Sequence, residues 1–281
     1  MYPTLYHAFL DLFGIDLPFL KFVNSFGFFV ALAFVAAHQV LSAELRRRTA
    51  LGQLAPTRRT ITVGAPATPL ELVMQGLLGF LLGWKALYMV LNMAEVTVDP
   101  PAFLLSGKGY FVGGLVVGAL FVWLLWKEKE KQRLKQPEQR EVIVPAVQHA
   151  GNITFLAALW GFIGAKLFHW LESPRDLMEL IKDPNAKDIV TGLTMYGGLI
   201  VAGLAIMRYF RRNGLAFWPA VDCAAPAVLL AYGIGRIGCQ VSGDGDWGVA
   251  NTAPTPSWLP QWMWSYDYPN NVNGVTGYNS L

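Results

Sequence analysis

The sequence predicts an all-α polytopic membrane protein with about six transmembrane helices. Of its 281 residues, 54% are apolar or aromatic and only 15% are charged, against roughly 25% charged residues in a typical soluble chain. The apolar residues gather in runs of about 20, the length at which a helix crosses a bilayer. The basic residues gather in alternate connections between these runs, a bias typical of multi-pass proteins.

Composition also excludes several classes of protein. Two cysteines in the whole chain are too few for a secreted disulfide scaffold. The 22 Lys and Arg nearly cancel the 19 Asp and Glu, which disfavours a nucleic-acid partner. The sequence has neither the Cys and His spacing of a zinc site nor a phosphate-cradling loop, so we expect no metal and no cofactor.

Six runs are long and apolar enough to span the bilayer. The first is followed by three consecutive arginines and has no basic segment before it, the reverse of a cleavable signal peptide. We therefore expect it to remain in the protein. The predicted spans are residues 19–43, 70–93, 109–126, 147–171, 192–210 and 215–238.

The positions of Lys and Arg orient these spans. Fourteen of the 22 lie at or beyond the ends of the first, third and fifth runs, five lie at or beyond the opposite ends of the runs, and the other three, Lys85, Lys166 and Arg236, belong to runs. Because basic residues are retained in the cytoplasm, we expect the odd-numbered connections inside and the amino terminus outside.

The connections differ in character. Residues 127–141 carry mixed charge and are expected to continue a helix into the cytoplasm before breaking near Pro137. Residues 172–190 are expected to form an ordinary external loop. Residues 239–281 form a polar tail rich in Gly, Trp and Asn, whose aromatic rings suit the headgroup layer. The predicted division is a helical bundle over 1–238 and an incomplete external loop over 239–281.

Charged residues inside spans need a reason, because a charge at mid-membrane costs about 2.5–3.5 kcal/mol. Lys85 lies past the middle of the second run, and its ammonium can extend toward the interface; we expect a structural role. Lys166 lies beside Gly161 and Gly164. Small residues let a second helix approach closely, so Lys166 is expected to point into a bundle.

Arg236 lies at the outer end of the sixth run, with Gly235 before it and Gly238 after it. Glycines expose backbone N–H groups, and a guanidinium offers a rigid fork that matches a phosphate or a carboxylate. The pattern favours an anion site at the outer membrane surface. A structural pair between Arg236 and Asp244 or Asp246 would also explain the charge.

Three further features each fit more than one interpretation. Gly197 and Gly198 indicate either close helix packing or a ligand. The charges within or at the edges of runs also fit a transporter or channel, which ranks second because they gather toward one face under an external Gly-rich segment. A calcium loop at residues 242–251 lacks the terminal Glu of an EF-hand. The four charges are Lys85, Lys166, Asp222 and Arg236.

Three segments resemble the prolipoprotein diacylglyceryl transferase family of bacterial inner membranes: residues 24–48, 161–200 and 222–248. The most specific motif is Gly-Arg-Ile-Gly at 235–238, ahead of an acidic Gly-rich turn. The segments follow one another in the order found in the family and cover well under half of the chain. The second and third spans look like an insertion relative to common members.

The resemblance implies transfer of a diacylglyceryl group from phosphatidylglycerol to the lipobox Cys thiol of a preprolipoprotein signal peptide. A thioether forms and glycerol phosphate leaves. The site implied is at the outer face of the inner membrane, within the lipid bilayer. Arg236 would stabilise the leaving phosphate. The remaining headgroup-binding residues implied are Lys166, Gly197, Gly198, Gly238 and Gly248.

Departures from the family pattern matter for the chemistry. Tyr196, a poor base at neutral pH, stands where most members have His, and we expect it to donate a hydrogen bond. Asp244 keeps the carboxylate of a family Glu, and Lys166 keeps the charge of a family Arg. With the His absent, Asp244 or His169 becomes the candidate base.

Family members also continue into further spanning helices beyond the outer loop, whereas this sequence stops at Leu281. We therefore expect either a fragment, an inactive product, or a site completed by another chain.

Overall fold

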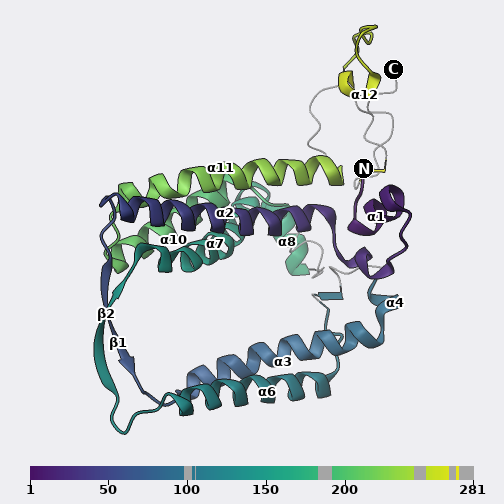
Figure 1. Cartoon of the computed structure of the whole chain (residues 1–281). Helices are drawn as coiled ribbons and strands as arrows, with labels where there is room; N and C mark the ends of the chain where they lie inside the picture. Colours follow the sequence, from purple (N-terminus) through teal and green to yellow (C-terminus); the bar gives the residue numbers. More distant parts are fainter. Residues whose placement is uncertain (98–102, 105, 183–191, 244–250, 266–269, 272–281) are drawn as a thin grey trace. The chain divides into compact units, whose positions relative to one another are not determined.

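A computed structural model describes residues 1–97, 103–104, 106–182, 192–243, 251–265 and 270–271. The chain is mostly helical and forms two compact units (Figure 1). The first combines Met1–Glu44 with Val221–Leu281, and the second is Leu45–Ala220. Two long helices, α2 (Ser25–Ala50) and α11 (Phe217–Ser242), begin in one unit and end in the other.

The first unit contains α1 (Leu5–Phe13), η1 (Pro18–Phe22) and most of α2 and α11, with the short α12 (Gln261–Trp264) in the tail. The helix of the first predicted span, α2, begins at Ser25, six residues after the predicted start. Pro18 starts a separate 3-10 turn, and the Asn24 side chain accepts a hydrogen bond from the Gly27 N–H at 3.2 Å, as a helix N-cap does.

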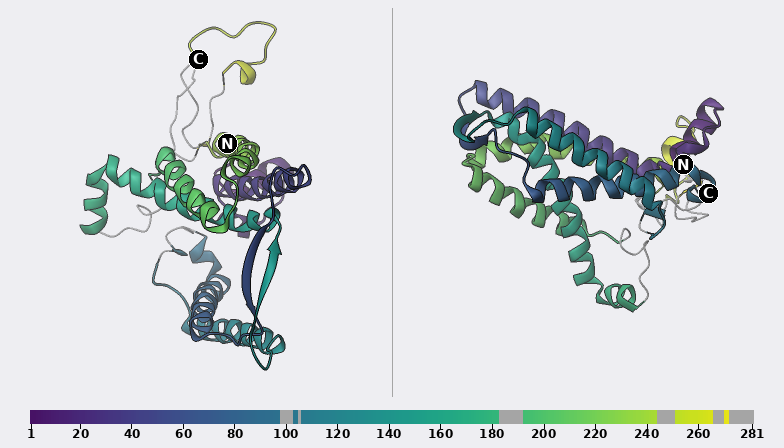
Figure 2. Two further views of the ribbon diagram at one scale, coloured as in Figure 1. Left: turned by 90° about the vertical axis from the view of Figure 1, so that its left-hand side faces the viewer. Right: turned by 90° about the horizontal axis from the view of Figure 1, so that it is seen from below.

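In the second unit, α3 (Pro69–Leu91) and α6 (Phe111–Lys131) pack side by side as a hairpin (Figures 1 and 2). Glycines set the closeness of this contact. A Cβ on Gly83 would lie 2.2 Å from the Gly113 carbonyl oxygen, so only glycine fits there. The start of α3 is fixed by a capping box between Thr68 and Glu71.

Lys85 holds the connection between α3 and α6. Its ammonium donates to three backbone carbonyl oxygens, those of Phe103 at 2.9 Å, Ser106 at 2.5 Å and Lys108 at 3.0 Å. These bonds satisfy the charge where water is scarce. The structural role predicted for Lys85 is therefore confirmed.

The same connection is tied a second time by an ion pair. The Lys108 ammonium lies 2.5 Å from the Glu95 carboxylate in α4 (Met93–Val96), which also accepts from the Tyr88 hydroxyl at 2.8 Å. The hydrogen bond from Lys108, and then that from Tyr88, lowers the pKa of the Glu95 carboxyl from its ordinary value.

Replacing Lys85 by Met should loosen this connection while α3 and α6 stay paired. Three carbonyl oxygens lose their donor, and each unsatisfied group costs about 1–3 kcal/mol. We expect residues 103–110 to be cut by protease severalfold faster than in the parent. Lys127→Met, which removes an ammonium from the far end of α6, is the control; equal cutting of Lys85→Met and the parent would contradict the role.

A two-stranded antiparallel ribbon joins the α3–α6 hairpin to the rest of the second unit. It pairs β1 (Thr57–Val63) with β2 (Glu138–Val144), with Thr57 opposite Val144 and Val63 opposite Glu138. The prediction of a mixed-charge helix is correct as far as Lys131, where α6 ends. The sequence patterns do not predict the ribbon; an all-α fold therefore holds for the spans and not for this connection.

The remaining helices of the second unit are η2 (Ala146–His149), α7 (Ala150–Glu172), α8 (Pro174–Lys182) and α10 (Met195–Asn213). The prediction of an ordinary loop over 172–190 is wrong for α8; residues 183–191 lie outside the described part. Pro174 occupies the first helical position, where its missing N–H costs nothing. Leu177 and Leu180 then share one half-buried face of the helix.

Among the described residues, five helical segments are long and apolar enough to cross a membrane: Ser25–Ala50, Pro69–Leu91, Phe111–Lys131, Ala146–Glu172 and Phe217–Ser242. They make the chain a polytopic helical membrane protein. The fifth of the six predicted spans is also a helix, α10, but three arginines near its end make it too polar to join these segments. A count of six spans therefore stays a prediction.

Candidate functional site

The predicted site residues of the second unit lie where α7 and α10 pack against each other (Figures 1 and 2). A Cβ on Gly197 would lie 2.5 Å from the Gly164 carbonyl oxygen, and a Cβ on Gly164 would lie 2.5 Å from the Gly197 oxygen. A Cβ on Gly198 would lie 2.9 Å from the Gly161 oxygen. Of the two interpretations of Gly197 and Gly198, close helix packing thus accounts for both positions.

Lys166 is buried on α7, with 5% of its surface exposed. Its ammonium lies 5.4 Å from the centre of the Trp170 ring, one helical turn along α7. The prediction that Lys166 points into packed helices is confirmed. Lys166 thus places a positive charge near the contact between α7 and α10.

His169 follows Lys166 on α7 and pairs with a carboxylate that the sequence did not single out. Its Nε2 lies 3.2 Å from Asp176 Oδ2 in α8. Gly192 also packs against the ring, since a Cβ there would lie 2.4 Å from Cε1 and Nε2. Since Gly192 also has a positive φ of 64°, a larger residue there is disfavoured twice.

Thr194 ties the start of α10 to the end of α7. Its N–H donates to the Ala165 carbonyl oxygen at 3.1 Å, and its hydroxyl donates to the Glu172 carboxylate at 2.8 Å. These bonds fix the beginning of α10 beside Lys166 and His169. One sequence signal could have pointed to Thr194, a hydroxyl residue just before a helix, which is the usual N-cap composition.

Tyr196 lies in the first turn of α10 and exposes 73% of its surface. It therefore points away from the packing contact made by its neighbour Gly197. Such a side chain is available to a substrate.

Arg236 and Gly238 lie on α11 in the first unit. Gly238 allows α11 to approach α2 closely, since a Cβ there would lie 2.7 Å from Phe29 Cβ and 3.5 Å from a ring carbon of Phe26. Arg236 precedes it by two residues and has an exposed side chain. The Gly-Arg-Ile-Gly motif thus combines a helix-packing glycine with an exposed arginine.

The predicted site is therefore divided. The second unit brings together Lys166, His169, Gly197 and Gly198, with Tyr196 next to them, and the first unit holds Arg236 and Gly238. The predicted residues Asp244 and Gly248, and Asp246 as the second possible partner of Arg236, lie outside the described residues. Within the described part of the chain, no three His, Cys, Asp or Glu residues gather as metal ligands would.

The side chains of these residues have the chemistry that anion binding and proton transfer require. Arg236 and Lys166 are the cations, and a guanidinium or ammonium stabilises charge that develops on a phosphate. His169, held by Asp176, has the arrangement of an oriented imidazole base. Sequence reasoning misses Asp176, Thr194 and Gly192, because α8 is not predicted and none of the three belongs to a recognisable motif.

Residues 131–270 match the model of the prolipoprotein diacylglyceryl transferase family. This range contains every predicted site residue, and it begins at the last residue of α6. Over these residues the chain belongs to the prolipoprotein diacylglyceryl transferase family. All residues before 131 lie outside the match, both the α3–α6 hairpin and residues 24–48, so the insertion of two helices stays a prediction.

Relatives of the family support the assignment. The chain is 33% identical to the phosphatidylglycerol–prolipoprotein diacylglyceryl transferase of Enterococcus faecalis over 157 residues, 52% of this chain and 49% of the relative. It is 28% identical to that of Bacillus velezensis over 151 residues, 53% and 51% of the two chains. The Thermus thermophilus transferase is 32% identical over 113 residues, 40% and 39%. The chain thus matches about half the length of these relatives or less, and no solved structure matches it significantly.

Proposed function

We propose that the chain transfers a diacylglyceryl group from phosphatidylglycerol to the lipobox Cys thiol of a preprolipoprotein signal peptide. The family match over residues 131–270 carries this proposal. In the reaction, the bond between the diacylglyceryl carbon and the phosphate oxygen breaks, and a carbon–sulfur bond forms. The thiol loses its proton, and glycerol phosphate leaves.

Arg236 is proposed to bind the phosphate of the lipid and to stabilise the charge of the leaving group. Its guanidinium offers two parallel N–H donors to two phosphate oxygens, which an ammonium cannot do. Lys166, buried beside Trp170, supplies a second positive charge for the headgroup. In the same proposal, Gly197 and Gly198 hold α10 close to α7, Gly238 holds α11 close to α2, and Gly248 is kept as a predicted headgroup contact.

The thiol must lose its proton, because the thiolate is the nucleophile and a free Cys has a pKa near 8.5. We assign this step to His169, with Asp244 as the second candidate. The contact between His169 Nε2 and Asp176 Oδ2 supports the assignment, since a carboxylate orients an imidazole and stabilises the imidazolium that forms. Tyr196 is proposed to donate a hydrogen bond to the substrate.

Replacing His169 by Gln should lower kcat about 100-fold, the usual contribution of a positioned base. Asp176→Asn should lower kcat by a smaller factor and leave the KM for phosphatidylglycerol unchanged, because Asp176 acts through His169. His7→Gln on α1 is the control. The assay measures initial rates of peptide modification in proteoliposomes. Unchanged kcat in His169→Gln would assign the base to another group, with Asp244 tested next.

The proposed topology is that of the charge bias: six spans, with α10 as the fifth, the amino terminus outside, and the site toward the periplasmic face of the bacterial inner membrane. Residues 1–238 then form the bundle and residues 239–281 the external loop. A transporter is not favoured, since the matching family and the relatives named above are transferases.

The proposal is tested with the 281-residue chain in phosphatidylglycerol liposomes and two synthetic lipobox peptides that differ only in Cys or Ser. We expect the Cys peptide to gain the mass of one diacylglyceryl group and the Ser peptide to stay unchanged, because only the thiolate attacks at neutral pH. Solute flux across the same liposomes, without peptide modification, would favour a transporter.

A further inference from the structure

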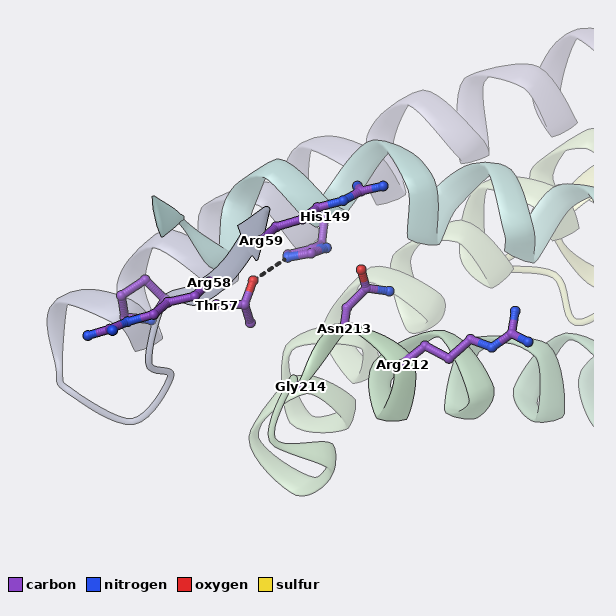
Figure 3. Close-up of a pocket in the computed structure, with 8 residues that line it drawn as sticks. Thr57, Arg58, Arg59, His149, Arg212, Asn213 and Gly214 are labelled. Atoms are coloured by element: carbon purple, nitrogen blue, oxygen red, sulfur yellow. Dashed lines mark hydrogen bonds between the residues drawn. The ribbon is translucent and has the colours of Figure 1, made fainter. Parts of the chain in front are cut away.

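A pocket of about 540 Å³ lies in the second unit, away from the α7–α10 glycine contact (Figure 3). Its walls come from three segments far apart in the sequence: the start of β1, the turn before α7, and the end of α10. The first and last of these belong to connections rich in basic residues. The pocket is lined by Pro56, Thr57, Arg58, Arg59, His149, Arg212, Asn213 and Gly214.

Strand geometry separates the two arginines of β1. Side chains alternate between the faces of a strand, so Thr57 and Arg59 share one face and Arg58 lies on the other. Figure 3 shows this arrangement: Arg58 extends away from the other labelled side chains, whereas Arg59 extends past His149. Arg212 extends along α10, with its guanidinium apart from that of Arg59. Both arginines line the pocket.

A chain of three side-chain hydrogen bonds links β1, the turn before α7, α7 and α10 beside the pocket. Asn152 Nδ2 donates to the Tyr209 hydroxyl at 3.0 Å, which lies 2.7 Å from His149 Nδ1, and His149 Nε2 lies 3.1 Å from the Thr57 hydroxyl. His149 is 4% exposed. With the imidazole proton on Nε2, Tyr209 donates to His149 and His149 donates to Thr57, so the Thr57 hydroxyl hydrogen remains for a ligand; with the proton on Nδ1, Thr57 donates to His149 instead.

The charge of the pocket is positive and uncompensated. Within the described part of the chain, neither Arg59 nor Arg212 forms an ion pair. The amino-terminal end of α7, which follows His149, adds a partial positive charge, while the carboxyl-terminal end of α10 at Asn213 opposes it. The two helix ends offset each other, and the guanidinium charges remain.

We propose that Arg59 and Arg212, assisted by the Thr57 hydroxyl and the Asn213 amide, bind a phosphate group. Two guanidinium forks and neutral donors are the usual partners of phosphate oxygens. The Asn213 side-chain amide donates one hydrogen bond to the Tyr209 carbonyl oxygen at 2.8 Å, and its second N–H can donate to a ligand. On the proposed topology the pocket opens at the cytoplasmic leaflet, where basic pockets between helices bind anionic lipid headgroups. The site is separate from the transferase residues.

The test measures two probes on the purified 281-residue chain in detergent: inorganic phosphate, and dioleoyl phosphatidic acid counted as bound lipid by native mass spectrometry. Phosphatidic acid avoids the proposed substrate, phosphatidylglycerol. The variants are Arg59→Gln with Arg212→Gln, and Arg46→Gln as the control, which removes the same charge from an exposed position on α2 in the same unit, outside the pocket lining. Peptide transfer from phosphatidylglycerol is measured on all of them.

We expect the double variant to bind at least about tenfold more weakly, while Arg46→Gln binds like the parent. Phosphate that displaces the lipid at millimolar concentration would identify a soluble ligand; lipid binding that phosphate does not displace would identify a headgroup. Equal binding of either probe by parent and double variant, or equal weakening in Arg46→Gln, would overturn the site. Diacylglyceryl transfer should be unchanged in the double variant. Absence of transfer in the parent would contradict the proposed transferase activity and would not contradict the phosphate site.

Discussion

Replacing Arg236 by Lys is expected to lower diacylglyceryl transfer at least about 100-fold, the usual loss when one donor to a developing oxyanion is removed. The positive charge stays, but the planar fork that contacts two phosphate oxygens is lost. Because the Arg236 side chain is exposed on α11, the variant should insert and fold as the parent does. Initial rates with a lipobox peptide in phosphatidylglycerol liposomes measure the effect.

Arg175→Lys is the matched control. Arg175 lies in α8, its side chain is exposed, and the proposed topology places it on the same side of the membrane as Arg236. The control should transfer at the parent rate, with equal amounts of both proteins in the membrane. An Arg236→Lys variant that matures lipoproteins at the parent rate would remove Arg236 from the mechanism.

Replacing Gly197 by Ala should destabilise the second unit by about 1–3 kcal/mol, the usual cost of overpacking. The new Cβ would lie 2.3 Å from Phe168 Cβ and 2.5 Å from the Gly164 carbonyl oxygen. A flexible side-chain tip could move aside, but a backbone oxygen moves only with α7 itself. In thermal melts of detergent-solubilised protein, we expect Tm to fall by roughly 3–10 °C.

Gly203→Ala on the same helix provides the comparison, because its Cβ would meet nothing within 4 Å. Alanine favours a helix over glycine by about 1 kcal/mol, so this variant should melt at or above the parent temperature. The two substitutions are chemically identical and should act in opposite directions. If Gly197→Ala had the same Tm as Gly203→Ala, α7 and α10 would not be in close contact at Gly197.

The spans can be predicted because a helix in a bilayer needs a long apolar run, and such runs are visible in the sequence. The sequence predicts that α6 continues beyond the apolar run, and the helix does so as far as Lys131, short of the predicted break near Pro137. It does not predict the pairing of Thr57 with Val144. That pairing joins segments far apart in the sequence, and no short turn connects the two strands to indicate that they pair. The helix α8 escapes prediction for a related reason, since a short segment with charged neighbours resembles a loop.

The site can be predicted in part. The burial of Lys166 follows from the cost of a charge in lipid and from the neighbouring glycines. The contact between His169 and Asp176 cannot be predicted, because it depends on the turn that redirects the chain between α7 and α8. The pocket at Arg59 and Arg212 is hidden for the same reason: the distribution of basic residues places both on one side of the membrane, but only folding brings them to one wall.

The central claim is tested most directly by following both halves of phosphatidylglycerol in one reaction. The 281-residue chain is incubated with lipobox peptide and with lipid labelled separately in the acyl chains and in the headgroup glycerol. We expect the acyl label on the peptide Cys as a thioether and the headgroup label in free glycerol phosphate, in equal amounts. Peptide that stays unlabelled while the chain is folded in the bilayer, or headgroup label released without thioether, would contradict the proposed transfer.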